Sequence, residues 1–159
     1  MEMAELKKLA IAIILCELAG IIGSFFTFSA IQDWYAYLDK PWFTPPGWLF
    51  GPVWTFLYLL MGISAYLVWK KGIEKKEVKL ALALFGLQLV FNCAWSIIFF
   101  GLRDAYFAFV EIILLWILIA LTISKFYLID KKSAYLMLPY LAWVSFAAVL
   151  NFSVWLLNG

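Results

Sequence analysis

The stretch "KPWFTPPGWLFGPVW" (Lys40–Trp54) runs directly into "TFLYLLMGISAYLVW", an apolar segment that ends at Trp69. Its fifteen residues contain four prolines, two glycines and three tryptophans. Prolines stiffen a chain and deny it regular helix, while indole rings collect where a membrane meets water. A stiff, indole-rich stretch that leads into a long apolar run therefore indicates a loop at the membrane surface followed by a membrane-spanning helix.

The composition of the whole chain agrees with this interpretation. Of its 159 residues, 67% are hydrophobic and 14% are charged, whereas a soluble domain is near half apolar and a quarter charged. A chain this short could not hide so much apolar surface from water. We therefore predict an integral membrane protein.

The residue types that are scarce exclude several kinds of chemistry. The chain has no histidine, the usual metal ligand, haem ligand and general base near neutral pH. Its two cysteines, Cys16 and Cys93, both lie inside apolar runs, so we predict no disulfide framework. We expect no metal site, no cofactor and no Ser-His hydrolase chemistry. The first apolar run is too long for a signal peptide and is expected to stay as a helix.

Several apolar runs are long enough to cross about 30 Å of hydrocarbon at 1.5 Å per residue. Backbone groups in lipid must bond internally, so each run is expected to be a helix. We therefore predict an all-α fold, a bundle of five transmembrane helices forming one domain over residues 1–159. The expected spans are about 9–31, 48–69, 80–102, 105–126 and 134–157.

The lysines and arginines predict the orientation of this bundle. With five spans, the N-terminus and the second and fourth loops share one side, which carries ten lysines, whereas the other side has only Lys40 and Arg103. Positive charge collects on the cytoplasmic side. We expect a multi-pass protein of a prokaryotic cytoplasmic membrane, with its N-terminus inside and its first loop outside.

Polar and aromatic residues recur at helical spacing in the outer half of the expected spans. Amides are costly in hydrocarbon unless they face the bundle interior and find partners. They could bond neighbouring helices together, or line a pocket with flat aromatic walls and a few orienting polar groups. The stripes comprise Trp54 and Tyr58 on the second span, Gln88, Asn92, Trp95 and Phe99 on the third, and Trp143, Phe146, Ala147, Leu150 and Asn151 on the fifth.

Two carboxylates, Glu17 and Glu111, lie within the expected spans. Intramembrane acids are functional candidates, so a proton-coupled role is one alternative. Glu111 could instead pair with Arg103 or reach outward. Gly20 and Gly23 give the first span a small-residue face, which suits either internal packing or a homodimer.

Three motifs carry a resemblance that covers the whole chain: "WYAYLDKPWFTPPGWLFGPVWTFLYLLMGISAYLVW" (34–69), "QLVFNCAWSIIFFG" (88–101) and "PYLAWVSFAAVLNFSVW" (139–155). In this order they closely resemble the translocator protein family, TspO/MBR. The resemblance implies a five-helix protein, often a homodimer, with a ligand cavity under the first loop. Members of that family bind porphyrins, and animal members also bind cholesterol and benzodiazepine-type drugs.

The expected ligand is therefore a porphyrin-type tetrapyrrole, and the expected function is that of a receptor or transporter. Membrane lipid and a second copy of the chain are expected partners; nucleic acid is not. The expected ligand-binding residues are Tyr35, Phe50, Trp54, Tyr58, Gln88, Asn92, Trp95, Phe99, Trp143, Phe146, Ala147, Leu150 and Asn151.

Two alternatives come with the resemblance. Bacterial relatives are reported to degrade porphyrin in light, and Trp54 and Trp143 match the tryptophans implicated, so they would be the catalytic residues. Sterol binding is a further alternative, but Phe152 and Leu156 stand where the animal cholesterol motif has a tyrosine and a basic residue.

The prolines of the opening stretch also predict local structure. Steric contact before a proline disfavours helix, so residues 42–45 are expected to be extended. Pro52 is expected in the first turn of the second helix, where a backbone donor has no partner. The stretch would then form a stiff lid over the pocket.

Overall fold

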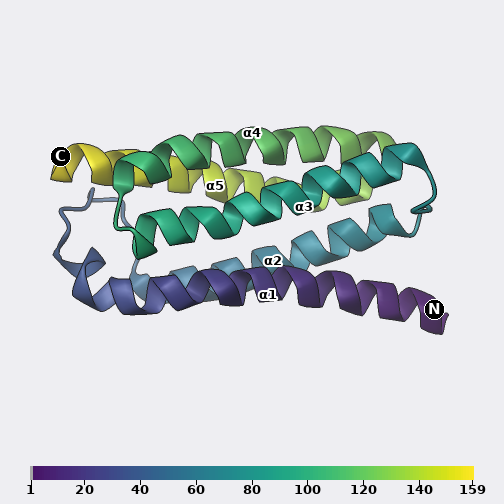
Figure 1. Cartoon of the computed structure of the whole chain (residues 1–159), viewed down its shortest axis with the longest axis horizontal. Coiled ribbons are helices and arrows are strands. Elements are labelled where there is room, and N and C mark those ends of the chain that lie inside the picture. The colour runs from purple at the N-terminus through teal and green to yellow at the C-terminus, as the bar shows by residue number, and fades with distance from the viewer. Residues whose placement is uncertain (1) are drawn as a thin grey trace.

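The computed structural model describes residues 2–159, and in this range the chain is helical and has no strand. Its long helices are α1 (Met3–Asp33), α2 (Gly47–Trp69), α3 (Lys76–Ser96), α4 (Ala105–Ile129) and α5 (Lys131–Asn158) (Figure 1). A short 3-10 helix, η1 (Tyr35–Tyr37), follows α1, and a π-helical turn, η2 (Ile97–Gly101), extends α3. Five helices are long and apolar enough to cross a membrane, so the predicted fold class is confirmed.

Several helices extend beyond the apolar runs from which they were predicted, because polar residues continue or cap them. The Lys8 ammonium lies 2.9 Å from a Glu5 carboxylate oxygen in the early turns of α1. Asp104 accepts a hydrogen bond from the backbone N–H of Phe107 at the start of α4, and Asp130 accepts one from that of Ser133 at the start of α5. Such caps satisfy N–H groups that have no partner within the helix.

The helices pack in a ring whose order differs from their order in the chain. Helix α1 lies against α2 and α3, α4 lies against α3 and α5, and α2 packs on α5. The ring therefore runs α1, α2, α5, α4, α3 and closes on α1. The odd number of spans places the two chain ends at opposite ends of the bundle (Figure 1).

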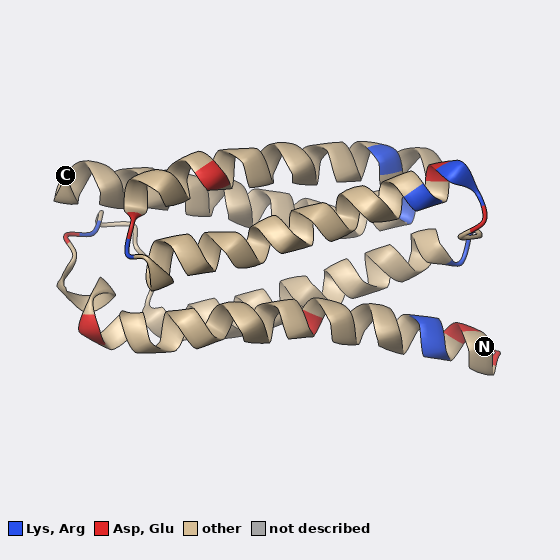
Figure 2. Ribbon diagram, in the orientation of Figure 1, with Lys and Arg blue, Asp and Glu red and all other residues tan. Residues whose placement is uncertain are grey.

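Charged residues gather at the two ends of this bundle (Figure 2). Lysines crowd the end that holds the N-terminus, the α2–α3 loop and the α4–α5 junction, whereas the first loop and the α3–α4 loop have Lys40 and Arg103. Which end faces the cytoplasm stays a prediction from this asymmetry.

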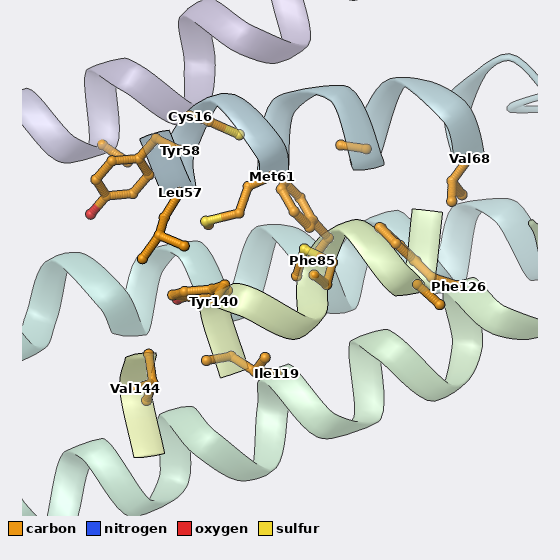
Figure 3. Packing of buried hydrophobic residues seen from close by; sticks show 14 of the residues in the cluster. Cys16, Leu57, Tyr58, Met61, Val68, Phe85, Ile119, Phe126, Tyr140 and Val144 are labelled. Carbon is orange, nitrogen blue, oxygen red and sulfur yellow. The ribbon is translucent and has the colours of Figure 1, made fainter. Parts of the chain in front are cut away.

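Most buried apolar side chains form one cluster along the bundle axis (Figure 3), and Phe99, Ala108 and Val154 form a second, smaller one. Small residues allow α1 to approach its neighbours closely: a Cβ atom on Gly62 of α2 would lie 2.6 Å from the Cα atom of Ile13. One on Gly20 would lie 2.5 Å from the ring of Tyr58, and one on Gly23 would lie 3.1 Å from the Ser96 hydroxyl. The small-residue face of α1 thus serves packing within the chain.

The first loop is more folded than its prolines predicted. The backbone N–H of Thr44 donates to the carbonyl oxygen of Pro41 at 3.1 Å, and the Thr44 hydroxyl donates to the same oxygen at 2.7 Å. The expectation that residues 42–45 are all extended is therefore wrong, because Trp42 and Phe43 form a turn closed by these bonds. The turn leaves Trp42 95% exposed.

The N-terminus of α2 also differs from the prediction. The helix begins at Gly47 with Pro46 as its N-cap, which places Pro52 in the second turn instead of the first. Pro52 therefore removes one backbone hydrogen bond, the one that its N–H would make to the carbonyl of Trp48. Trp48 is 73% exposed at the end of the bundle.

Candidate ligand site

A chain of hydrogen bonds joins three helices in the middle of the bundle. The Tyr58 hydroxyl of α2 donates to the side-chain oxygen of Asn92 on α3. The Asn92 amide nitrogen donates to the Tyr140 hydroxyl of α5 at 2.9 Å, and that hydroxyl donates to the side-chain oxygen of Gln88 at 2.8 Å. All four side chains are buried. The network bonds α2, α3 and α5 together. Of its polar side-chain atoms, the amide nitrogen of Gln88 is the one without a partner among the described residues.

A second polar contact joins α3, α4 and α5 closer to the first loop. The indole N–H of Trp95 donates to the side-chain oxygen of Asn151 at 3.0 Å, and the Asn151 amide donates to the carbonyl oxygen of Ala105 at 2.8 Å. Asn92 and Asn151 therefore both bond helices together, which is the first of the two roles considered for these amides.

Trp54 extends the central network with an aromatic wall. Its indole stacks on the Tyr58 ring at a centroid distance of 5.6 Å and meets the Tyr140 ring edge-on at 6.2 Å. The Tyr140 side chain is fully buried (Figure 3). Trp54 is thus held against the two tyrosines that carry the hydrogen bonds.

Trp143 lies in a separate aromatic group beneath the first loop. Phe50 of α2 meets its ring at 6.0 Å, and Phe146, one turn along α5, lies 5.5 Å away. Phe43 of the first loop packs on Phe146 at 6.2 Å. The indole nitrogen of Trp143 is buried, yet no hydrogen-bond acceptor in residues 2–159 lies within reach. A buried N–H without an acceptor is costly, which sets this indole apart from that of Trp95.

A third aromatic group surrounds Phe99. Trp95 stacks on Phe99 at 5.2 Å, and Tyr35 of η1 meets both Phe99 and Phe100. The π-helical turn, closed by the backbone N–H of Leu102 and the carbonyl of Ile97, presents Phe99 to this group. No sequence pattern had indicated the π-helical turn.

The predicted ligand residues thus form three contacting groups: Trp54 with the polar network, Trp143 with Phe146 and Phe50, and Trp95 with Tyr35 and Phe99. On α5, Ala147 is half-buried and Leu150 is buried. Two cavities lie elsewhere, one of about 560 Å³ at the lysine-rich end and one of about 300 Å³ beside Arg103 and Trp155. None of the predicted ligand residues lines either cavity.

Tyr140 is the site residue that sequence reasoning missed. It connects the polar network to Trp54, and its position in the chain held a usable signal. Tyr140, Val144, Ala147 and Asn151 recur at spacings of four, three and four, which is one helical face. The predicted stripe of α5 therefore continues one turn further than was inferred.

The intramembrane acids have different surroundings. Glu111 of α4 is buried, and neither of its carboxylate oxygens has a partner in the described part of the chain. Pairing with Arg103, one of the two alternatives considered for Glu111, does not form, and Arg103 is exposed in the α3–α4 loop. Glu17 of α1 is half-buried. Neither acid contacts the aromatic groups through a hydrogen bond.

Comparison with known proteins places this architecture in a family. The profile of the TspO/MBR family matches residues 12–156. The chain belongs to the TspO/MBR family. The "Tryptophan-rich protein TspO" of Archaeoglobus fulgidus is 47% identical over 155 residues, which cover 97% of this chain and 99% of the relative.

More distant members of the TspO/MBR family match most of the chain as well. The "Translocator protein" of Homo sapiens is 42% identical over 141 residues, covering 87% of this chain and 83% of that protein. The "Protein CrtK" of Rhodobacter capsulatus is 39% identical over 154 residues, covering 97% and 94%. These matches and the five membrane-spanning helices make this TspO/MBR chain an integral, multi-pass membrane protein.

Proposed function

We propose that this TspO/MBR protein is a receptor or transporter that binds a flat hydrophobic ligand of the porphyrin type beneath the first loop. The observation that carries the proposal is the Trp143 indole, whose buried N–H has no acceptor among residues 2–159 and whose ring packs against those of Phe50 and Phe146. Aromatic walls with a few convergent polar groups are typical of small-molecule sites.

A porphyrin matches these groups chemically. Its macrocycle is flat and aromatic, so it can stack against indole and phenyl rings, with each pair contributing about 0.5–1.5 kcal/mol beyond area burial. Its peripheral carboxylates are strong acceptors for an indole N–H. The Trp143 N–H would then gain a partner on binding, whereas the amides of Asn92 and Asn151 already have theirs.

The first loop would allow the ligand to enter from the side of the membrane on which the loop lies. Phe43 is the loop residue that packs on Phe146, so movement of the Pro41–Thr44 turn would uncover the Trp143 group. One flank of the loop is held, because the Asn158 side chain bonds both the N–H and the carbonyl of Asp39, at 3.0 and 2.9 Å. A lid that is anchored on one side loses less conformational entropy when it closes.

Titration of the purified protein with protoporphyrin in the dark tests the proposal, with quenching of tryptophan fluorescence as the readout. Trp143→Phe should bind at least several-fold more weakly than the parent, because it lacks the N–H. Trp69→Phe, at the opposite end of α2, is the matched control and should bind as the parent does. Equal affinities in the two variants would remove the Trp143 group from the site.

Light-dependent breakdown of porphyrin is a second candidate function, with molecular oxygen as the oxidant. It is favoured by Trp54, an easily oxidised indole packed on the rings of Tyr58 and Tyr140. Illuminated porphyrin should then disappear faster with the protein than with free tryptophan at matched indole concentration, because bound indoles act at high effective molarity. At porphyrin concentrations that saturate each variant, Trp54→Phe and Trp143→Phe should show most of the light-dependent breakdown abolished, because phenylalanine lacks the easily oxidised indole. If both variants bleach porphyrin as fast as the parent does, the indoles take no part in the breakdown, and the protein acts as a carrier or sensor.

The remaining expectations extend this proposal. We propose that the first loop faces outward, because the lysine-poor end of the bundle holds it. A homodimer stays a prediction. Sterol binding gains no support from Phe152 and Leu156, which are 38% and 61% exposed on the outside of α5.

A further inference from the structure

A groove of about 560 Å³ lies at the lysine-rich end of the bundle, between the end of α2 and the junction of α4 with α5. It is far from the aromatic groups of the candidate ligand site, and the proposed function makes no use of it. Its lining combines charged and apolar side chains: Leu67, Lys70, Lys71, Ile129, Asp130, Lys131 and Lys132.

The two walls of this groove are fastened to each other. The Lys71 ammonium lies 3.0 Å from an Asp130 carboxylate oxygen, which ties the end of α2 to the α4–α5 junction. Below this ion pair, the buried Ser64 hydroxyl of α2 donates to the carbonyl oxygen of Ser133 on α5 at 2.8 Å. The groove is therefore a formed feature of the fold, and its shape does not depend on a mobile loop.

Two further ammonium groups are positioned by aromatic rings. The Lys70 ammonium lies 5.4 Å from the centre of the Tyr66 ring, and that of Lys131 lies 5.5 Å from the Tyr127 ring. These distances are in the range of cation–π contacts. Such contacts leave the N–H groups of an ammonium available, since each lysine has three donors.

The charge of the groove is unbalanced. Four lysines line it against one aspartate, and Asp130 is already paired with Lys71. The ammonium of Lys132 has no ion pair or ring contact in the described part of the chain. The groove therefore presents three lysines whose charge is not neutralised by a carboxylate within it.

Two apolar side chains also line the groove. Leu67 and Ile129 line it together with the lysines. Leu128, which precedes Ile129 in the chain, is 78% exposed, as expected of a side chain that faces lipid. A free anion would use the lysines only. A phospholipid would use both kinds of side chain, with its phosphate on the lysines and its glycerol and first methylenes on Leu67 and Ile129.

We propose that this groove binds the phosphate headgroup of an anionic phospholipid from the leaflet at the lysine-rich end. Basic pockets between transmembrane helices on the cytoplasmic side suit such headgroups. This site is independent of the proposed porphyrin site, because the two lie in different parts of the bundle and share no residue.

A matched pair of triple variants tests the proposal. The groove variant, Lys70→Gln with Lys131→Gln and Lys132→Gln, removes the unpaired charges and keeps the Lys71–Asp130 bond. The control variant replaces three lysines at the same end that do not line the groove. These are Lys75→Gln, Lys76→Gln and Lys79→Gln. Both variants change the net charge equally, so general attraction to an anionic surface falls by the same amount.

The assay is native mass spectrometry of protein released from mixed micelles of phosphatidylglycerol and phosphatidylcholine with the same acyl chains. The parent and the control variant should retain one phosphatidylglycerol in preference to phosphatidylcholine. The groove variant should retain it about tenfold less, because a hydrogen bond to a charged group contributes about a factor of ten or more. Thermal unfolding in phosphatidylcholine micelles should be the same for all three proteins.

Other results would overturn the proposal. Equal loss of phosphatidylglycerol in both triple variants would mean that only surface charge matters. Displacement of the lipid by millimolar inorganic phosphate would mean that the groove recognises a free anion and not a lipid. If the groove variant unfolds, Lys132→Gln alone removes an ammonium that makes no ion pair or ring contact with the described residues. Unchanged retention in that variant would then refute the site.

Discussion

Replacing Trp143 by phenylalanine should leave the empty protein more stable than the same replacement at Trp95 does. Both changes remove the indole N–H and one ring from half-buried sites in the bundle. The difference lies in the hydrogen bonds. The Trp95 N–H donates to the buried side-chain oxygen of Asn151 at 3.0 Å, whereas the Trp143 N–H is buried without an acceptor in the described part of the chain.

The size of the difference follows from these two environments. Removing the unpaired Trp143 N–H relieves a cost of about 1–3 kcal/mol. Removing the Trp95 N–H loses a bond of about 0.6 kcal/mol, or about 1.7 kcal/mol at most, as measured for hydrogen bonds between membrane helices. The lost ring volume is the same in both and largely cancels. Trp143→Phe should therefore be more stable than Trp95→Phe by about 2 kcal/mol or more.

Reversible unfolding in detergent, followed by circular dichroism, measures this difference. Porphyrin should then stabilise the parent more than it stabilises Trp143→Phe. At a ligand concentration of 100 Kd the free energy of unfolding of the parent rises by about 2.7 kcal/mol, and that of Trp143→Phe should rise by less. If the two variants lose equal stability without ligand, the Trp143 N–H is satisfied in the folded protein. The proposed ligand site would then lose the observation that carries it.

Three further predictions concern the scaffold. Gly62→Ala should lower the free energy of unfolding by about 1–3 kcal/mol, because the new Cβ would press on the α1 backbone. An unchanged thermal midpoint would contradict the close approach of α1 and α2. Burial alone would raise the pKa of Asp130, but hydrogen bonds from Lys71 and from the α5 backbone outweigh it and hold that pKa below its usual range. The Asp130 carboxylate therefore stabilises the fold at pH values above the usual carboxyl pKa, and this contribution is lost as the pH falls through the lowered pKa. Asp130→Asn should flatten the acid side of a curve of stability against pH. An unaltered acid side would rule out a stabilising Lys71–Asp130 ion pair. Cysteines placed at Gly47 and Lys75 should react with an impermeant thiol reagent from opposite faces of oriented membranes, and labelling of both from one face would refute the five-span topology.

The predicted interior stripe of α3 illustrates what helical spacing can and cannot reveal. Spacing alone indicated that Gln88, Asn92 and Phe99 face inward, and all three are buried. It could not indicate their partners, because a partner depends on which helix stands opposite and at what height. Tyr140, which bonds both Asn92 and Gln88, was missed for that reason.

The first loop marks a second limit. Proline sterics predicted an extended segment, yet the Thr44 side chain and backbone close a turn on Pro41. The preference before a proline restricts one residue at a time, whereas a turn depends on a hydrogen bond between residues three apart. The local rule was therefore outweighed by a contact that it does not include.

The amino-acid sequence by itself determined the class of this protein. Apolar runs of about twenty residues can satisfy their backbone groups in lipid only as helices, and the uneven lysines distinguish the two ends of the bundle. Only the tertiary structure decided which polar groups are used and which are left over. The ring order places α5 between α2 and α4. In this arrangement Asn92 bonds to Tyr140 and Asn151 bonds to Ala105, whereas the Trp143 N–H has no acceptor among the described residues. The physical reason is that helical periodicity sets the face a side chain lies on, whereas the packing of five helices sets what that face meets.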